Sequence, residues 1–330
     1  MSVSGLGSSP PRWVDDLFPF PTPQAFRTLI DIAWEREYEF YLENGSYDFI
    51  ELSTRFDFMF DLERFPAPLD GWDPGYPEFT EECRQPSAPM FATPEFVPFG
   101  SLGTGSCVGW LVPAPELQRP DQPVALASGH FGGVTWLGPD TRTGLEVMLS
   151  WTLRRWREDP KHWADTIASE RPLVDRLAAE LGVHPDPDKA YIGSSWKGTT
   201  VVMDEEYEIV FDVPQGWHHA EGADGIGVLA PSDAFSGREP IVPYQRVESG
   251  EDLEPALADA ARALDAGYPA TALLGIRDTF EATPSCYFAE LKPLWARAYR
   301  DLGRNHLTET LDRMESMYQP LSCYCSSPHR

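Results

Sequence analysis

The densest set of side chains that could bind a metal ion is the short run His218, His219, Glu221 and Asp224. Imidazole nitrogens and carboxylate oxygens are ordinary zinc ligands, so this run is the strongest candidate for a metal-dependent hydrolase. Adjacent residues of a strand point to opposite faces, however, and two neighbouring histidines therefore rarely share one ion. Because the run follows Trp217 and its preceding glycine, we interpret it as a solvated turn without a metal.

The C-terminal tail holds a second group of metal-ligand types, Cys323, Cys325 and His329. A structural zinc site needs four ligands, and the tail supplies three. We therefore interpret this group as a chain terminus that binds no metal.

A glycine-rich loop spans residues 100–105 and could cradle a phosphate group if a helix followed it. A strand is predicted after it instead, and no Lys-Ser or Lys-Thr pair follows, so these glycines indicate turns. Neither Ser194-Ser195 nor Ser106-Cys107 stands in the Gly-x-Ser-x-Gly pattern of a serine nucleophile. We assign no catalytic, cofactor-binding or metal-binding residue and expect no cofactor.

Composition narrows the class of protein. The 330 residues include 26 basic and 52 acidic side chains, for a net charge of −26. Such a chain lacks the basic face that a nucleic-acid binder needs to displace counterions, and it would be repelled by anionic lipid. An acidic surface attracts a basic protein instead. Hydrophobic residues make up 42% of the chain and aromatic residues 12%, which are values of a globular protein.

The sequence also indicates a cytoplasmic protein. Its five cysteines are odd in number and unevenly spread, so they do not describe a disulfide framework. The first 20 residues have no apolar run of the kind found in a secretory signal, and no stretch approaches 18 consecutive apolar residues. We expect no membrane contact.

The chain is organised around residues 94–151, where short apolar runs alternate with turn residues. This pattern predicts a meander of antiparallel strands followed by a helix over about 143–156. We expect one shared core to collect the side chains of Phe96, Val108, Trp110, Val124 and Trp136. The predicted strands are Phe96–Pro98, Ser106–Leu111, Val124–Ser128 and Val134–Leu137.

The entry Pro-Glu-Phe-Val-Pro-Phe-Gly at 94–100, the glycine-rich turn and Val108-Gly109-Trp110 resemble the SUKH superfamily. This superfamily includes immunity proteins of bacterial toxin systems. The resemblance covers about residues 20–156. It implies an α+β fold with an antiparallel sheet and flanking helices, and it implies a protein that binds and blocks a cognate toxin.

Helical spacing predicts several helices outside the meander. One begins at Pro23 and carries Phe26, Leu29 and Ile30, and another covers about 171–181, from near Pro172 to Gly182. Residues 190–246 are β-rich. Residues 251–318 show four helical segments, and their offsets are loosely similar to those of tetratricopeptide repeats. We expect their interior to hold Leu257, Leu264, Leu273, Leu294, Trp295 and Leu311.

These patterns divide the chain into five parts. We predict a disordered N-terminus over 1–19, a SUKH-like domain over 20–156, and a linking helix with a second β-rich segment over 157–248. Helical hairpins follow over 249–320, and a tail covers 321–330. Whether the second β-rich segment extends the first sheet or forms its own is left open by the sequence.

The sequence therefore favours a non-enzymatic protein that binds a basic protein partner, an immunity protein acting by occlusion of its toxin. One alternative is a hydrolase or other metal-dependent enzyme that uses residues 218–224. Another is a scaffold that binds a peptide between its C-terminal helices. The oligomeric state and the partner's identity are not predicted.

Overall fold

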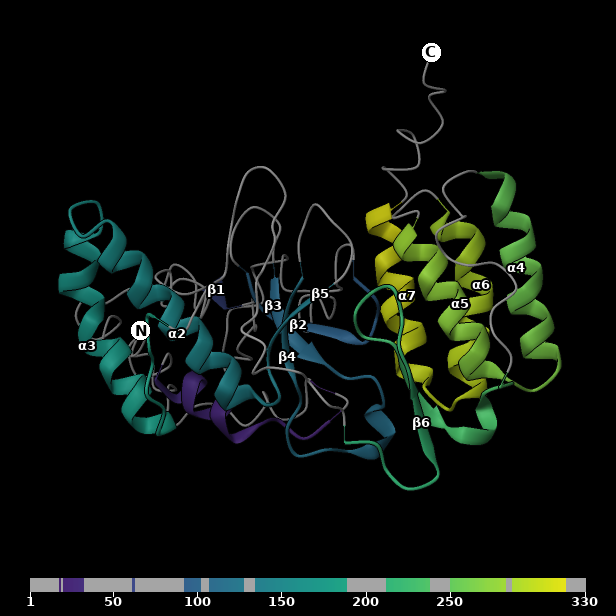
Figure 1. Cartoon of the computed structure of the whole chain (residues 1–330), viewed down its shortest axis with the longest axis horizontal. Coiled ribbons are helices and arrows are strands. Elements are labelled where there is room, and N and C mark those ends of the chain that lie inside the picture. The colour runs from purple at the N-terminus through teal and green to yellow at the C-terminus, as the bar shows by residue number, and fades with distance from the viewer. Residues whose placement is uncertain are drawn as a thin grey trace, which may run out of the picture.

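A computed structural model describes residues 18, 20–32, 61–62, 92–101, 107–127, 134–188, 212–237, 250–282 and 287–318. A five-stranded sheet lies in the middle of the molecule, with α2 and α3 at one end and the four C-terminal helices at the other (Figure 1). The fold is therefore α+β, as predicted. Residues 24–32 are helical. The remaining elements are β1 (Asp61–Leu62), β2 (Phe96–Ser101), β3 (Cys107–Leu111), η4 (Pro115–Leu117), β4 (Val124–Ala127), β5 (Val134–Gly138), α2 (Thr141–Glu158), α3 (Ala164–Leu181), β6 (Trp217–Ala220), β7 (Val228–Pro231), η5 (Ser232–Ala234), α4 (Gly250–Asp265), α5 (Pro269–Ala282), α6 (Phe288–Asp301) and α7 (Asn305–Tyr318).

The central sheet is an antiparallel meander with the strand order β1-β2-β3-β4-β5. The four predicted strands are confirmed, and the first one continues through Gly100 to Ser101. The register shifts between Pro98 and Gly100 and again between Val124 and Ala125. Glycine is required at Gly109, because a Cβ atom there would lie 2.5 Å from the Val97 carbonyl oxygen.

One face of the sheet is covered by the helix at 24–32, α2 and α3. Trp110 is fully buried at its centre, with ring centroids 4.7 Å from Phe26 and 4.5 Å from Phe99. Its indole Nε1 donates to the Thr141 hydroxyl at 2.9 Å, so the polar end of the ring is satisfied. Leu177 of α3 is buried in the same core. This core contains Val108, Trp110 and Val124, three of the five residues that were predicted to share one core.

The opposite face of the sheet holds a second, smaller core, and here the prediction of one shared core is wrong. Phe96 and the partly buried Trp136 pack on this face with Ile226. The physical reason is the alternation of side chains in a strand: Phe96 precedes Val97, which pairs with Trp110, so Phe96 points away from Trp110. Both faces of the sheet are therefore covered.

The helices α2 and α3 begin differently. Asp140 caps α2, since its carboxylate accepts from the Thr143 amide at 2.7 Å. The predicted start of α3 near Pro172 is wrong, because the helix begins at Ala164 and Pro172 lies inside it. Ile167, in the first turn, is partly buried against the core, and this contact favours the helix ahead of the proline, whose missing N–H removes one helical hydrogen bond. The helix ends at Gly182 in the left-handed conformation, as predicted.

The four C-terminal helices α4 to α7 are confirmed, and successive helices pack on one another. Gly267 and Gly303 stand at helix ends with φ values of +84° and +76°, the conformation that favours glycine. Leu264, Leu273, Trp295 and Leu311 are buried in the bundle as predicted, whereas Leu257 and Leu294 are only partly buried.

A hairpin of β6 and β7 forms a separate two-stranded sheet between the central sheet and the bundle (Figure 1). Val228 and Ala230 are buried in the core of the bundle, while Ile226 is buried in the second core of the central sheet. The Trp136 indole also donates to the Gly225 carbonyl oxygen at 3.1 Å. The hairpin therefore joins the sheet to the helices. Of the β-rich stretch predicted at 190–246, residues 190–211 and 238–246 lie outside the described residues.

Candidate functional site

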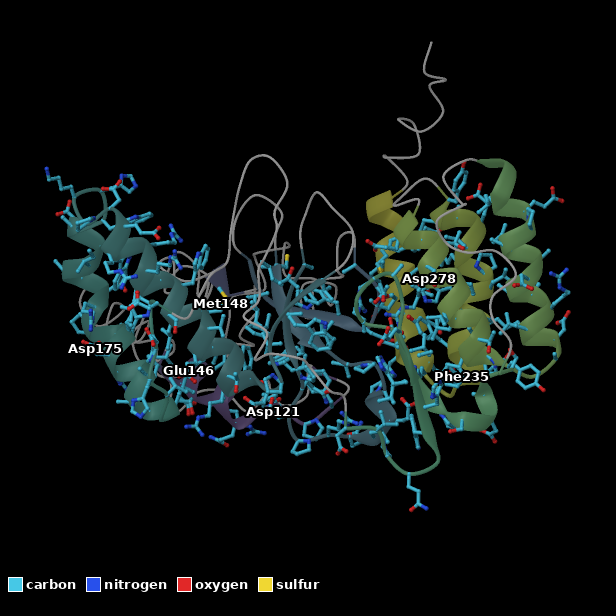
Figure 2. All side chains as sticks on the ribbon, viewed as in Figure 1. Asp121, Glu146, Met148, Asp175, Phe235 and Asp278 are labelled. Carbon is cyan, nitrogen blue, oxygen red and sulfur yellow. The ribbon has the colours of Figure 1, made fainter. Side chains whose placement is uncertain are left out.

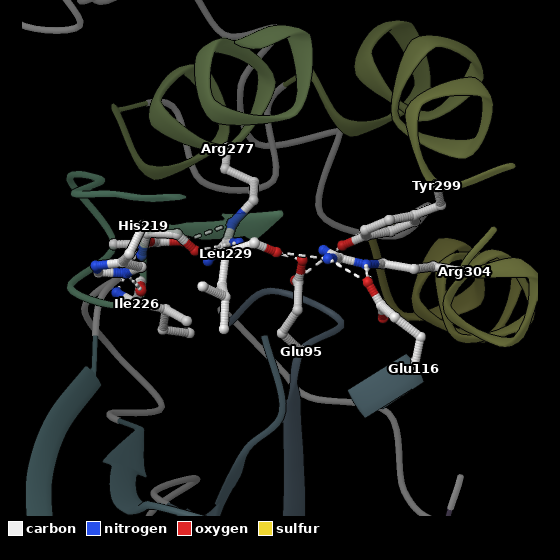
Figure 3. Close-up of polar contacts among 10 residues, drawn as sticks. Glu95, Glu116, His219, Ile226, Leu229, Arg277, Tyr299 and Arg304 are labelled. Atoms are coloured by element: carbon white, nitrogen blue, oxygen red, sulfur yellow. Dashed lines mark hydrogen bonds and ion pairs between the residues drawn. The ribbon is translucent and has the colours of Figure 1, made fainter. Parts of the chain in front are cut away.

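Four polar side chains meet in the interior where the bundle packs on the sheet (Figure 3). Arg277 of α5 donates from Nε to Asp224 Oδ2 at 2.7 Å, and its Nη2 pairs with the same carboxylate. Its Nη1 donates to Glu95 Oε1 at 3.1 Å and to the Gly227 carbonyl oxygen at 2.7 Å. Tyr299 of α6 donates to Glu95 Oε2 at 2.8 Å. Each of the four is at most 2% exposed.

A second pair extends this contact. Arg304, between α6 and α7, donates from Nε to Glu116 Oε1 at 3.0 Å and from Nη2 to the same oxygen at 2.7 Å. Its Nη2 also donates to the Leu229 carbonyl oxygen of β7. Arg304 is 1% exposed, whereas the side chain of Glu116 is 31% exposed. Glu116 is thus fixed from the inside and reaches the surface.

Burial and the neighbouring charges together set the pKa values of the buried groups in this network. Burial lowers the pKa of Arg277, but the charges of Asp224 and Glu95 outweigh it and leave the pKa raised. Burial and the charge of Glu95 raise the pKa of Tyr299 well above its ordinary value, so its hydroxyl stays protonated and donates. Arg277 therefore remains a cation and Tyr299 a neutral donor throughout the physiological pH range.

The buried network has a structural role. A substrate cannot reach side chains that are at most 2% exposed without opening the fold. Asp224 Oδ1 also accepts from the amides of Ile226 and Gly227, each at 3.0 Å, so its acceptor positions are occupied. We therefore call Glu95, Asp224, Arg277, Tyr299, Glu116 and Arg304 the junction network, which holds the bundle, the hairpin and the sheet together.

An open groove of about 550 Å³ lies beside the junction network. It forms where η4, the hairpin and the turns after α4 and α6 meet. The partly exposed Trp217 contributes an indole ring to the lining of this groove. Its lining residues are Glu116, Trp217, Pro231, Asp233, Ala234, Gly267, Pro269, Asp301 and Leu302, which we call the acidic groove.

The acidic groove is negatively charged. Among the residues that the structure describes, Glu116, Asp233 and Asp301 are the three ionisable residues that line it, and no Lys or Arg does. Glu116 is paired with the buried Arg304, and Asp301 lies 3.6 Å from Arg297 Nε. Within the described residues Asp233 has no ion pair, and it is exposed. The groove therefore offers at least one uncompensated carboxylate beside an indole ring.

The structure corrects our interpretation of 218–224 as a solvated turn. His218 and His219 lie in β6. Residues Trp217–Ala220 of this strand pair antiparallel with Val228–Pro231 of β7, so they form a hairpin and not a turn. His218 is exposed and packs edge-on against Phe235, whereas His219 Nε2 lies 2.9 Å from the Ile226 carbonyl oxygen. Asp224 is buried in the junction network, while Glu221 is exposed. The four side chains are therefore not brought together.

Most of the other candidate site residues from the sequence lie outside the part of the chain that the structure describes. Cys323, Cys325, His329, Ser106 and the pair Ser194-Ser195 lie outside the described residues. Of the glycine-rich loop, Gly100 belongs to β2 and residues 102–105 are outside the described part. Among the described side chains, no group of three or more His, Cys, Asp or Glu residues is placed to hold a metal ion.

No protein-family model matches the chain, and no curated protein sequence is significantly similar to it. The resemblance to the SUKH superfamily therefore rests on the residues of the meander alone. Of the helices that the structure describes, none combines the length and the apolar character needed to cross a membrane.

Sequence reasoning did not find the junction network or the acidic groove. One signal was present in α5, where Arg277 falls four residues after Leu273 and three before Phe280, on the apolar face of the helix. A charged residue at such a position is rarely buried unless it is paired. The pattern indicates that Arg277 has a buried acidic partner, but it does not say which residue that partner is.

Proposed function

We propose that this protein binds a protein partner with a basic face through the acidic groove, and that it acts as an immunity protein that occludes its cognate toxin. The observation that carries the proposal is the exposed Asp233, which lines the same groove as Trp217, where no described Lys or Arg is among the lining residues. The net charge of −26 adds a long-range attraction for the same class of partner. The resemblance to SUKH immunity proteins supports the more specific role.

The groove suits an Arg or Lys side chain of the partner. A cation over the Trp217 ring gains about 0.5–1 kcal/mol when the contact stays wet and about 2 kcal/mol when water is excluded. Asp233 and Asp301 lie in the same groove and supply acceptors for the N–H groups of that cation. Tryptophan and arginine are also the residues that most often dominate protein interfaces.

Binding is better supported than catalysis at this place. The lining of the acidic groove contains no His, Cys, Ser, Thr, Tyr or Lys side chain, so the described residues supply no nucleophile with an adjacent base. Its surface instead combines one aromatic ring, prolines and carboxylates, a composition that complements a basic side chain.

The test is co-expression with the product of a toxin gene adjacent to this one, followed by measurement of survival and of binding kinetics. Trp217→Ala should weaken the complex about five- to thirtyfold, which corresponds to about 1–2 kcal/mol. Asp233→Asn should lower the association rate at low salt and change it little at high salt, because screening removes the attraction. Survival should fall with affinity.

Asp175→Asn is the matched control, since Asp175 is an exposed carboxylate of α3 far from the groove (Figure 2). It should leave affinity unchanged while altering the net charge as Asp233→Asn does. Equal effects of the two aspartate substitutions, together with full affinity of Trp217→Ala, would show that the groove is not the binding site. Absence of both protection and complex would contradict the immunity role.

A further inference from the structure

The end of the molecule opposite the acidic groove carries a cation that lies over two aromatic rings. The guanidinium carbon of Arg155 in α2 lies 5.0 Å from the ring centroid of Trp151 and 4.6 Å from that of Trp163. Trp151 precedes Arg155 by one helical turn, and Trp163 stands just before α3. All three side chains are partly exposed. The α2–α3 turn thus holds one guanidinium in a defined place.

Arg155 differs from its neighbours in having no carboxylate partner. Arg154 pairs with Glu158 at 2.8 Å, and Arg157 pairs with Asp188 at 2.8 Å. The Arg155 side chain makes no hydrogen bond or ion pair with any residue that the structure describes. Burial lowers the pKa of Arg155, and no nearby charge opposes that effect. In a chain with 52 acidic and 26 basic side chains, such a cation is unexpected.

We infer that Arg155, which lies over the rings of Trp151 and Trp163, is a binding site for a carboxylate group. The guanidinium carbon lies over both rings, and the N–H donors make no hydrogen bond to a described residue, so they can donate to an anion. A guanidinium fork donates two parallel hydrogen bonds to a carboxylate. Because the contacts with the two rings hold the side chain beforehand, little rotamer entropy is lost when the anion binds.

The local charge favours a single carboxylate over a phosphate dianion or a polyanion. The pairs Arg154–Glu158 and Arg157–Asp188 are neutral, and the remaining cations Arg155 and Lys161 stand beside the carboxylates of Asp159, Asp165 and Asp186. The turn therefore has no excess of positive charge, which a dianion or polyanion would need, whereas a single carboxylate needs only the Arg155 guanidinium. The remaining charge of the chain repels nucleic acids and anionic membranes. This inference does not depend on the proposed function of the acidic groove.

The experiment is an NMR titration of the full chain that follows the arginine Nε–Hε signals, with sodium acetate as the probe and sodium chloride at equal ionic strength as reference. Acetate should shift the Arg155 signal in a saturable way and chloride should not. Arg155→Met should abolish the saturable response measured at the Trp151 and Trp163 indole N–H signals. Arg155→Lys should weaken acetate binding about tenfold or more, because it loses the two-pronged hydrogen bonding.

Arg154→Met serves as the control, since it removes a neighbouring arginine that is already paired with Glu158. It should bind acetate almost as the unmodified chain does, because the Glu158 side chain that it leaves unpaired is 59% exposed and its charge is screened by salt. Equal responses to acetate and chloride, or an unchanged acetate response in Arg155→Met, would overturn the inference. A stronger response to sodium phosphate than to acetate would overturn the choice of carboxylate.

A further arm separates the two sources of a carboxylate. An N-acetylated, C-amidated tripeptide with a central aspartate presents a side-chain carboxylate in a protein-like context, whereas acetate represents a free small acid. Tighter binding of the peptide than of acetate supports a protein ligand, and the reverse order supports a small carboxylic acid. Binding of neither compound would contradict the site.

Discussion

Replacing Arg277 by methionine tests whether the junction network holds the bundle to the sheet. Methionine keeps much of the volume of the side chain and removes its charge and its donors. Four interactions are lost, two to Asp224, one to Glu95 and one to the Gly227 carbonyl oxygen. Both carboxylates then remain buried without their cation, although Tyr299 and two backbone amides still donate to them.

The expected loss of stability follows from the interactions that are lost and those that remain. Removal of one partner from a buried ion pair typically costs about 3–5 kcal/mol, because an uncompensated charge is left in the interior. The remaining donors to Glu95 and Asp224 place Arg277→Met within that range rather than above it. Since a folded protein is stable by only about 5–15 kcal/mol, the variant should unfold at a much lower urea concentration.

The assay is urea unfolding followed by far-UV circular dichroism and by tryptophan fluorescence, because the bundle and the sheet need not unfold together. Arg262→Met is the control, since Arg262 lies on the surface of α4 and its side chain is 63% exposed. The triple variant Glu95→Gln, Asp224→Asn, Arg277→Met removes the buried charges together and should be less destabilised than Arg277→Met alone. A loss below about 1 kcal/mol for Arg277→Met, or a triple variant that is less stable than the single one, would refute the reasoning.

Two further predictions concern the sheet core and the bundle. Trp110→Ala should cost about 3–5 kcal/mol and lower the melting temperature by roughly 10 °C, because the fully buried ring and its hydrogen bond to Thr141 are lost; an almost unchanged melting curve would contradict the core. Burial lowers the pKa of His306, so the folded state binds fewer protons than the unfolded one below the ordinary value of about 6.5. Stability should therefore be full above about pH 6.5 and fall as the pH drops through the lowered pKa, and urea unfolding across this range should show a smaller fall for His306→Gln. Equal slopes in the two proteins would contradict this assignment.

Much of the fold was predictable because its signals are local. The strands of the meander are short apolar runs between turn residues, and their observed limits differ from the predicted ones by at most three residues. The C-terminal helices follow the helical spacing of apolar residues, and Gly267 and Gly303 end two of them as only glycine readily does. These features depend on neighbours within a few positions in the chain.

The face of the sheet on which each apolar side chain lies was harder to predict. Phe96 and Trp136 are as apolar as Trp110, so composition does not say which face each one joins. The face depends on register, and a shift of one residue reverses it. The register shifts at Pro98/Gly100 and Val124/Ala125 are set by pairing between strands, which the sequence of one strand does not contain.

The acidic groove depends on contacts that are still more distant in sequence. Arg304 and Glu116 are 188 residues apart, and Arg277 and Glu95 are 182 apart, so no local pattern connects them. Glu116 belongs to both the junction network and the groove, because Arg304 holds its carboxylate from the inside. A substitution of Arg304 should therefore affect stability and partner binding together. Trp217 and Asp233 line the groove without a hydrogen bond to the junction network, so their substitution separates binding from stability.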